Sequence, residues 1–372
     1  MKKFVKLSLA AAVATAGLTS ANAGSLEEMI KGVEVSGTAV LRYNDYQNDN
    51  TNDATSSNFS KLAVDVVSPV NDTLSFGATV ETDAATSGFA TGSANTNTMN
   101  SETADSNLQL SALNFTYTGV ANTTIIAGKQ AVDTPWTVAA DSDGATHNGT
   151  GIVAVNTSTP VTLIGAYFNQ TNFGTVAGDS MQVIGAKASI EGFNLEAMYA
   201  NQEDSLDSWT IAGSTKFSAN DIDFGLSVRH TELQVDGATN DNTLSQAKLT
   251  AKSGNYGAFV AYGVTGNGST DGVAFDGSAA TAMEGWNTGL NDQADASYLM
   301  TGVNAQVLPT FNVALNYFDR EGDTVADDAS ELYTQLTWKP SKNFYTYLRY
   351  GFDIEIEGVE QNRGRLQAEY KF

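Results

Sequence analysis

The feature that most constrains this chain is an alternation of apolar and polar residues with a period of two, repeated in blocks of about ten residues from residue 33 to residue 372. In the last block, one face would carry Leu366, Ala368, Tyr370 and Phe372, and the residues between them are charged or amide side chains. Successive side chains of a strand point to opposite faces, so one face suits lipid and the other suits water. A soluble β-sandwich alternates in the same way, so this pattern alone leaves both folds open.

The connections between the blocks favour a membrane barrel. Short turn sequences, such as Asn71-Asp72 and Gly254-Asn255, alternate with long polar segments. The predicted long loops cover residues 47 to 58, 84 to 105, 131 to 150, 173 to 179, 202 to 206, 232 to 243, 265 to 297, 321 to 329 and 354 to 360. Outer-membrane barrels have short turns at one end and long loops at the other, and this count gives about 18 strands, with 16 as the alternative. Because lipid offers no partner to a backbone amide, only a closed sheet is stable there. The sequence therefore predicts an all-β, transmembrane antiparallel β-barrel.

The amino terminus predicts export. Residues 1–23 combine a basic leader, an apolar run from Leu7 to Leu18 and an A-x-A site that ends at Ala23. The apolar run is shorter than the roughly 20 residues that a membrane-spanning helix needs, so it indicates a cleaved signal peptide and a mature chain that starts at Gly24. Residues 24–32 predict one short helix with a Ser25 to Glu28 capping box. Residues 33–372 then form a single transmembrane barrel domain.

Composition argues against several other classes of protein. The chain has no cysteine, which excludes a small domain held by disulfides. Without the leader, 16 basic residues face 42 acidic ones, and a formal charge of −26 makes nucleic acid an unsuitable partner. The two histidines, His147 and His230, lie near no recognisable nucleophile motif. We therefore expect no enzymatic activity.

Several blocks of sequence resemble one protein family. They are Leu26-Glu27-Glu28, Ile30-Lys31, Val35-Ser36-Gly37, Leu41-Arg42-Tyr43, Ile125-Ile126-Ala127-Gly128-Lys129-Gln130, Trp136-Thr137, Arg365-Leu366-Gln367-Ala368 and Tyr370-Lys371-Phe372. In these blocks the chain resembles the major outer membrane protein, or porin, family of Campylobacter-type bacteria. The resemblance implies a trimeric general porin with a preference for cations and a third long loop that folds inward. The terminal Phe372 also resembles the signal that the outer-membrane assembly machinery recognises.

The loop from residue 131 to residue 150 is the candidate constriction. It carries Asp133, Asp141 and Asp143. If the loop folds into the barrel, these carboxylates lie at the narrowest point of the lumen, where low-dielectric walls concentrate the field on passing ions. A solvated outer loop is the alternative.

Basic side chains are expected on the lumen wall opposite this loop. Strand parity places Arg42, Lys61, Lys129, Arg349 and Arg365 inward, together with Asp65, Glu81, Asp83 and Glu369. Closure pairs the last strand with the first, which makes Arg42, Arg349 and Arg365 neighbours. A field between this basic side and the acidic loop would orient polar solutes. Mutual pairing of the lumen charges is equally compatible with the pattern.

A divalent cation is a further expectation for the same loop, although no cofactor is required. Asp141-Ser142-Asp143-Gly144 brings two oxygen ligands close together, which suits Ca²⁺. The motif lacks the third ligand before the glycine and the distal glutamate of an EF-hand loop.

These features predict a general diffusion porin of the bacterial outer membrane. It would lie in the lipid bilayer as a homotrimer and pass small hydrophilic solutes and ions, cations preferentially. A channel specific for sugars or amino acids is one alternative, and Tyr345 and Tyr347 beside Arg349 would suit it. A barrel that acts as an adhesin or structural protein through its loops 84 to 105 and 265 to 297 is another.

Overall fold

The computed structural model describes residues 32–48, 53–82, 108–139, 146–173, 180–268, 272–323, 327–356 and 358–372. Its strands are β1 (Glu34–Asn48), β2 (Asp53–Asn71), β3 (Leu74–Thr82), β4 (Leu108–Val120), β5 (Thr123–Ala131), β6 (Asn148–Ser158), β7 (Val161–Thr171), β8 (Met181–Ile190), β9 (Phe193–Gln202), β10 (Leu206–Ala219), β11 (Ile222–Val235), β12 (Asn242–Ser253), β13 (Tyr256–Thr265), β14 (Ser297–Leu308), β15 (Phe311–Glu321), β16 (Ala329–Trp338), β17 (Phe344–Ile356) and β18 (Val359–Lys371). The prediction of 18 strands is confirmed, and the alternative of 16 is wrong. The predicted signal peptide lies outside the described residues, and so does the predicted helix except for Gly32, which is in a turn. Within the described ranges, no helix is long and apolar enough to cross a membrane.

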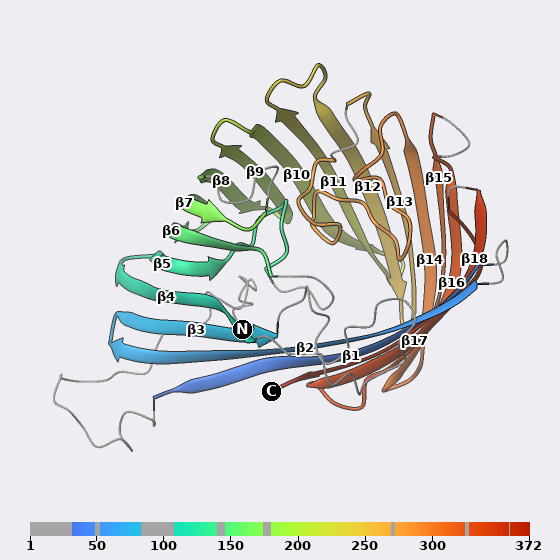
Figure 1. The fold of residues 1–372 in the computed structure, drawn as a ribbon, viewed down its shortest axis with the longest axis horizontal. Coiled ribbons are helices and arrows are strands. Elements are labelled where there is room, and N and C mark those ends of the chain that lie inside the picture. The colour runs from blue at the N-terminus through green and yellow to red at the C-terminus, as the bar shows by residue number, and fades with distance from the viewer. Residues whose placement is uncertain are drawn as a thin grey trace.

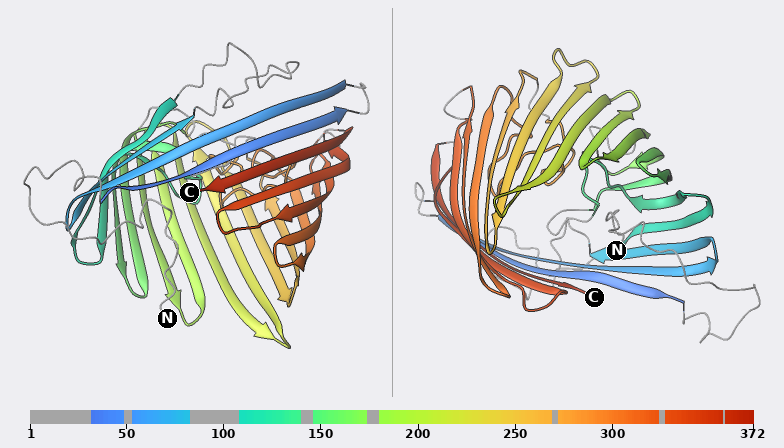
Figure 2. Two further views of the ribbon diagram at one scale, coloured as in Figure 1. Left: turned by 90° about the horizontal axis from the view of Figure 1, so that it is seen from below. Right: turned by 180° about the vertical axis from the view of Figure 1, so that it is seen from behind.

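The strands form one closed antiparallel sheet. Each strand pairs with the next along the chain, and β1 also pairs with β18, so the first and last strands meet (Figures 1 and 2). At this seam Arg42 stands opposite Gln367, and Thr38 stands opposite Lys371. Closure gives every strand two neighbours and leaves no edge of unpaired amides, as a sheet in lipid requires.

Tight turns join the strands at one end of the barrel, and longer connections join them at the other. The turn between β8 and β9 contains Glu191 with φ 48° and Gly192 with φ 87°. Two successive residues in the left-handed region match the twist of a two-residue hairpin, and glycine takes this conformation without strain. Asn122, between β4 and β5, and Asn220, between β10 and β11, adopt the same region. Turns and longer connections alternate as predicted, but three of the predicted long loops are wrong in extent: residues 53–58 belong to β2, and the connections predicted at 202 to 206 and 354 to 360 contain only residues 203–205 and 357–358.

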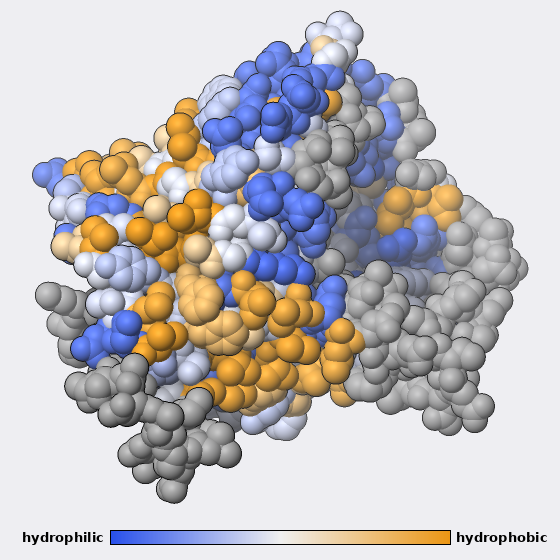
Figure 3. Space-filling view, turned by 60° about the vertical axis from the view of Figure 1, so that its left-hand side comes forward, coloured by the Kyte–Doolittle hydropathy of each residue, from blue (hydrophilic) through white to orange (hydrophobic). Residues whose placement is uncertain are grey.

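The two faces of the sheet follow the alternation in the sequence. On β11, Leu226 and Val228 are exposed on the outer wall, whereas Arg229, the residue after Val228, forms an ion pair with Glu196 of β9 on the inner wall. Aromatic side chains such as Trp209 and Tyr256 lie towards the two ends of the outer apolar strip. Figure 3 shows apolar residues gathered over part of this wall. An outer apolar band between aromatic girdles is the surface that a membrane barrel presents to lipid.

Candidate pore constriction

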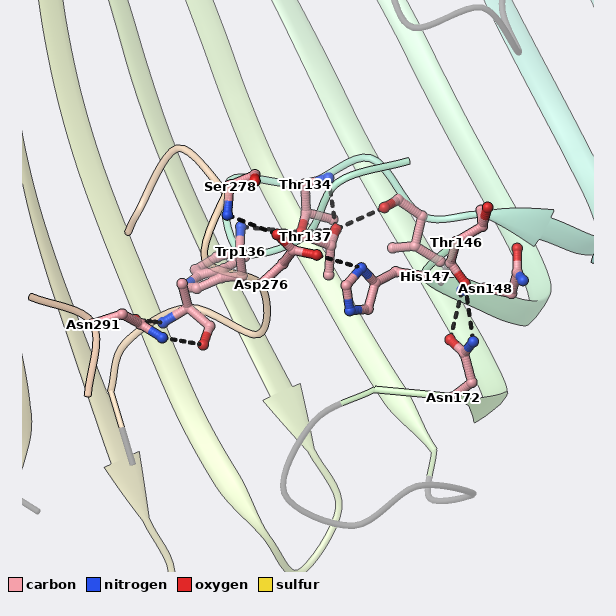
Figure 4. Close-up of polar contacts among 12 residues, drawn as sticks. Thr134, Trp136, Thr137, Thr146, His147, Asn148, Asn172, Asp276, Ser278 and Asn291 are labelled. Atoms are coloured by element: carbon pink, nitrogen blue, oxygen red, sulfur yellow. Dashed lines mark hydrogen bonds and ion pairs between the residues drawn. The ribbon is translucent and has the colours of Figure 1, made fainter. Parts of the chain in front are cut away.

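One loop folds inward directly after β5. We call residues 132–147 the first inward loop, of which 132–139 and 146–147 are described. Trp136 is 0% exposed because it packs against Phe168, Met181 and Met198 on the inner face of β7 to β9. A local turn holds it there, in which the Thr137 hydroxyl donates to the Val132 carbonyl at 2.6 Å (Figure 4). The described part of the loop therefore lies inside the barrel.

A second loop also folds inward. We call residues 266–296, between β13 and β14, the second inward loop. Its Met283 and Leu290 belong to a buried cluster with Leu233, Leu244 and Tyr298 from the inner face of β11, β12 and β14. The sequence predicted only a long polar loop here, so the inward packing of its described residues is new information. It also removes most of this loop from the outer surface on which an adhesin would depend.

The two inward loops are joined to each other. The Phe275 amide donates to the Trp136 carbonyl at 2.8 Å, and the Thr281 amide donates to the Pro135 carbonyl at 2.9 Å. Figure 4 shows a further contact, in which His147 Nδ1 lies 3.5 Å from a carboxylate oxygen of Asp276. His147 thus links the two inward loops. Together the loops form one unit across part of the lumen.

Arginines from the two ends of the chain lie side by side on β17, β18 and β1. We call Arg42, Arg349, Arg363 and Arg365 the basic wall. Arg349 Nε and Nη2 donate to the Gln335 side-chain oxygen at 2.9 and 2.7 Å. Its guanidinium also lies over the rings of Trp286, Tyr333 and Tyr347, at 5.1, 4.9 and 5.2 Å from their centroids. Stacking on aromatic faces holds the guanidinium in place without neutralising its charge.

The other members of the basic wall also have neutral partners. Arg365 Nε donates to Asn44 Oδ1 at 2.8 Å, and Arg42 Nε donates to Gln367 Oε1 at 2.7 Å. Arg363 Nη1 donates at 2.6 Å to the side-chain oxygen of Asn287. Since Arg365 also lies 5.7 Å from the Trp286 ring, the basic wall meets the second inward loop at residues 286 and 287.

Lys61, unlike Arg349 and Arg363, forms an ion pair with a carboxylate of the lumen wall. Its ammonium lies 3.6 Å from Glu81, and both side chains are buried. Thr146 of the first inward loop donates to the same Glu81 carboxylate at 2.8 Å. For Lys61 and Glu81, the expected alternative of paired lumen charges therefore holds, and the pair also fixes the end of the first inward loop to the wall.

Lys129 is not where strand parity placed it, and that prediction is wrong. Lys129 stands opposite Leu113, which is exposed on the outer wall, and residues directly opposite each other share a face. On this strand the inward positions belong to the buried Ile126 and Gln130. The Lys129 ammonium donates instead to the Leu110 carbonyl at 2.7 Å, near the loop end of β5. A long lysine stem can lie along an apolar surface while its charge reaches a polar group.

The predicted acidic residues are described only in part. Asp133 is exposed at the start of the first inward loop. Asp83, Asp141 and Asp143 lie outside the described residues, and with them the expected Ca²⁺ site. In the described ranges, no group of three or more His, Cys, Asp or Glu side chains could hold a metal ion. Inward Asp65 accepts from Thr79 at 2.6 Å, and inward Glu369 lies 3.1 Å from Lys371.

Sequence reasoning missed three residues of this region. Arg363 has the same parity as Arg365, so the alternation of β18 could have identified it. Trp286 and the buried Glu331 gave no such signal, because their roles depend on how the second inward loop meets β16.

The comparisons with known proteins agree with this geometry. The family model described as Campylobacter major outer membrane protein matches residues 1–276. Among solved structures, OccAB1 of Acinetobacter baumannii has a TM-score of 0.72 and 14% identity, covering 91% of this chain and 96% of its own. OccK9 of Pseudomonas aeruginosa has a TM-score of 0.73 and 15% identity, covering 92% and 99%. OccK2 of the same organism, in complex with glucuronate, has a TM-score of 0.70 and 13% identity, covering 92% and 98%. At these identities the structural likeness concerns the fold. No curated protein sequence matches the chain.

Proposed function

Because this chain belongs to the Campylobacter major outer membrane protein family and is an outer-membrane porin, we propose that it passes small hydrophilic solutes and ions with a preference for cations. The family is one of channel proteins, so the prediction of a function other than catalysis is confirmed, as is the location in the outer membrane. The observation that carries the proposal is the first inward loop, which lies inside a closed barrel at Trp136 and at Thr146.

The cation preference rests on charge. Ala139 and Thr146 are the described residues that flank Asp141 and Asp143, and Thr146 contacts the lumen wall. This arrangement supports a place for the two carboxylates beside the passing solute, where a confined charge acts on ions most strongly. The formal charge of −26 after removal of the predicted leader would further concentrate cations at the pore mouth.

Reversal potentials of the reconstituted protein test the proposal. Replacing Asp141 and Asp143 together by Asn should move the KCl reversal potential toward zero even in concentrated salt. The matched change at Asp49 and Asp53, which the sequence places in an outer loop, should act only in dilute salt, because exposed charges are screened over about 8 Å at physiological ionic strength. The same salt dependence for both pairs would show that the acidic residues do not line the constriction.

Selectivity for carboxylate-bearing solutes is a second candidate function, and the basic wall favours it. Among the described residues, neither Arg349 nor Arg363 forms an ion pair with a carboxylate. Confined cations usually have anionic partners, so a solute carboxylate is the partner that these two lack. OccK2, which shares this fold, has been solved in complex with glucuronate, a sugar acid. Block of the ion current by glucuronate but not by glucose would favour this candidate. An ion current that neither solute blocks would favour the general porin.

The outer apolar wall supports a proposal about assembly. We infer a homotrimer in the lipid bilayer, inserted by the outer-membrane assembly machinery, because the family resemblance implies both and identical barrels can bury part of their apolar walls against one another. Chemical cross-linking in mild detergent should give a trimer, and a species that stays monomeric would contradict this. A conductance near zero in planar bilayers would favour the adhesin alternative.

A further inference from the structure

Glu331 is a fully buried carboxyl group on the inner face of β16, where a porin lumen is ordinarily polar and wet. It is 0% exposed. One carboxyl oxygen accepts from the Trp286 amide at 2.7 Å and from the Thr288 hydroxyl at 3.1 Å. The other accepts from the amide and from the side-chain nitrogen of Asn287, both at 3.0 Å. All four donors come from three consecutive residues of the second inward loop.

The turn around this carboxyl group leaves little free space. The Gly285 amide donates to the Thr288 carbonyl at 2.7 Å, and the Tyr298 hydroxyl also donates to that carbonyl, at 3.0 Å. A Cβ atom at residue 285 would overlap the Glu331 carboxyl group and the Phe318 ring. Gly285 is therefore required by close approach, and the turn is fixed against β14 to β16.

The turn also determines what faces the basic wall. Trp286 stands edge-on to Tyr333, with ring centroids 5.4 Å apart, and its ring is the surface over which Arg349 and Arg365 lie. Asn287 accepts from Arg363 through its side-chain oxygen while its side-chain nitrogen donates to Glu331. Within the described part of the chain, Glu331 makes no ion pair with an arginine, so it reaches the basic wall through residues 286 and 287.

We propose that Glu331 is a positioning residue of the pore: it fixes residues 286–288 so that Trp286 holds the basic wall in place and limits the width of the passage beside it. This inference rests on the proposed channel function. It names the part of the second inward loop that sets the width of the passage. A buried carboxylate is costly unless its oxygens are satisfied, and here the four donors offset that cost only while the turn keeps its shape.

Replacing Glu331 by Gln tests the proposal. The new amide group can accept through one oxygen, but its NH₂ group would face the two nitrogen donors of Asn287, so the turn loses its fit. In planar bilayers, single channels of Glu331→Gln should show a higher conductance and more frequent current fluctuations than the unchanged protein. The control is Glu355→Gln, the same chemical change on the exposed Glu355 of β17, which should leave both quantities unchanged.

Two further variants separate position from charge. Gly285→Ala displaces the turn without altering any charge, and it should raise the conductance in the same direction. The exchange Glu331→Gln with Asn287→Asp restores the net charge of the unchanged protein by placing the carboxylate on the loop, and it restores one side-chain hydrogen bond with reversed polarity. That double variant should recover only part of the original conductance, because a Gln side chain at position 331 still cannot accept from all the remaining donors of residues 286–288, whereas an effect of net charge alone would predict full recovery.

The outcomes distinguish this inference from the proposed function. If the unchanged protein does not conduct, the channel proposal fails first. If the unchanged protein conducts and Gly285→Ala conducts identically, Glu331 does not act by position and the inference is overturned. A shift in reversal potential at unchanged conductance in Glu331→Gln would likewise overturn it, because it would show an electrostatic effect alone. Heat-modifiable mobility on gels confirms that each variant has folded. If Glu331→Gln does not fold, Trp286→Leu takes its place: it removes the ring but keeps the turn, and it should raise the conductance.

Discussion

Replacing Arg349 by Gln removes one positive charge from the basic wall. A guanidinium has five N–H donors, and Gln335 accepts two of those of Arg349. The rings of Trp286, Tyr333 and Tyr347 cover its flat faces, so a passing anion meets the N–H groups at its edge. The substitution therefore removes an edge donor and its charge together.

The size of the effect follows from Coulomb's law. A unit charge about 4 Å from an anion contributes about 1 kcal/mol even in water, which is about a five-fold change in local anion occupancy. Arg349 is half-buried, and the medium around it is less polarisable than bulk water, so this value is a lower estimate. Charges in a confined passage are also screened less by salt than charges at a mouth.

The zero-current potential across a KCl gradient measures the consequence as a ratio of chloride to potassium permeability. Arg349→Gln should lower that ratio by about five-fold, and Arg349→Lys, which keeps the charge, should lower it much less. Lys129→Gln removes the same charge from the outer wall and should leave the ratio unchanged. Equal shifts for Arg349→Gln and Lys129→Gln, or no shift in either, would refute the placement of the basic wall in the ion path.

Three further predictions, two on substitutions and one on the amino terminus, have defined outcomes. Lys61→Met leaves the buried Glu81 without its cation and should cost about 3–5 kcal/mol of stability, seen as a lower unfolding temperature in detergent, whereas changing Glu81 to Gln as well should recover much of it. Trp136→Ala empties a fully buried site and should cost about 3–5 kcal/mol, with noisier currents as the first inward loop loosens. The mature protein in outer-membrane fractions should begin at Gly24, and an amino terminus at Met1 would contradict the predicted leader.

The barrel could be predicted from the sequence because its determinants are local. Alternation determines which residues face lipid, and turn sequences determine where strands end. The number of strands and the neighbouring arginines at the seam could therefore be predicted. The predicted inward position of Lys129 was wrong because the side chains that face the lumen on this strand are those of Ile126 and Gln130. The burial of these two residues shows which face is inward. A lysine at the loop end of an outer wall is tolerated, so charge alone does not decide the face.

The inward loops could not be placed, because their positions depend on contacts between distant segments. A partial signal did exist: Phe168, Met181, Leu233 and Leu244 occupy inward positions where a water-filled lumen would need polar residues. Their apolar character indicates that something covers the inner wall near the loop ends. This apolar character does not identify which loop covers the wall. The role of Glu331 likewise depends on its hydrogen bonds with residues 286 and 287 of the second inward loop, which the sequence does not predict.

The seam between β1 and β18 has a consequence for how the pore can vary and assemble. The basic wall draws Arg42 from one end of the chain and Arg365 from the other, and the hydrogen bond from Arg42 to Gln367 spans 325 residues. Contacts of such separation form late, since they carry the largest loop-closure entropy. An unclosed sheet therefore has an incomplete basic wall, because Arg42 joins the arginines of β17 and β18 only when β1 pairs with β18. Conversely, a hairpin gained or lost between β5 and β13 would change the circumference of the barrel and leave the four arginines on adjacent strands, with the loop that contacts them still between β13 and β14.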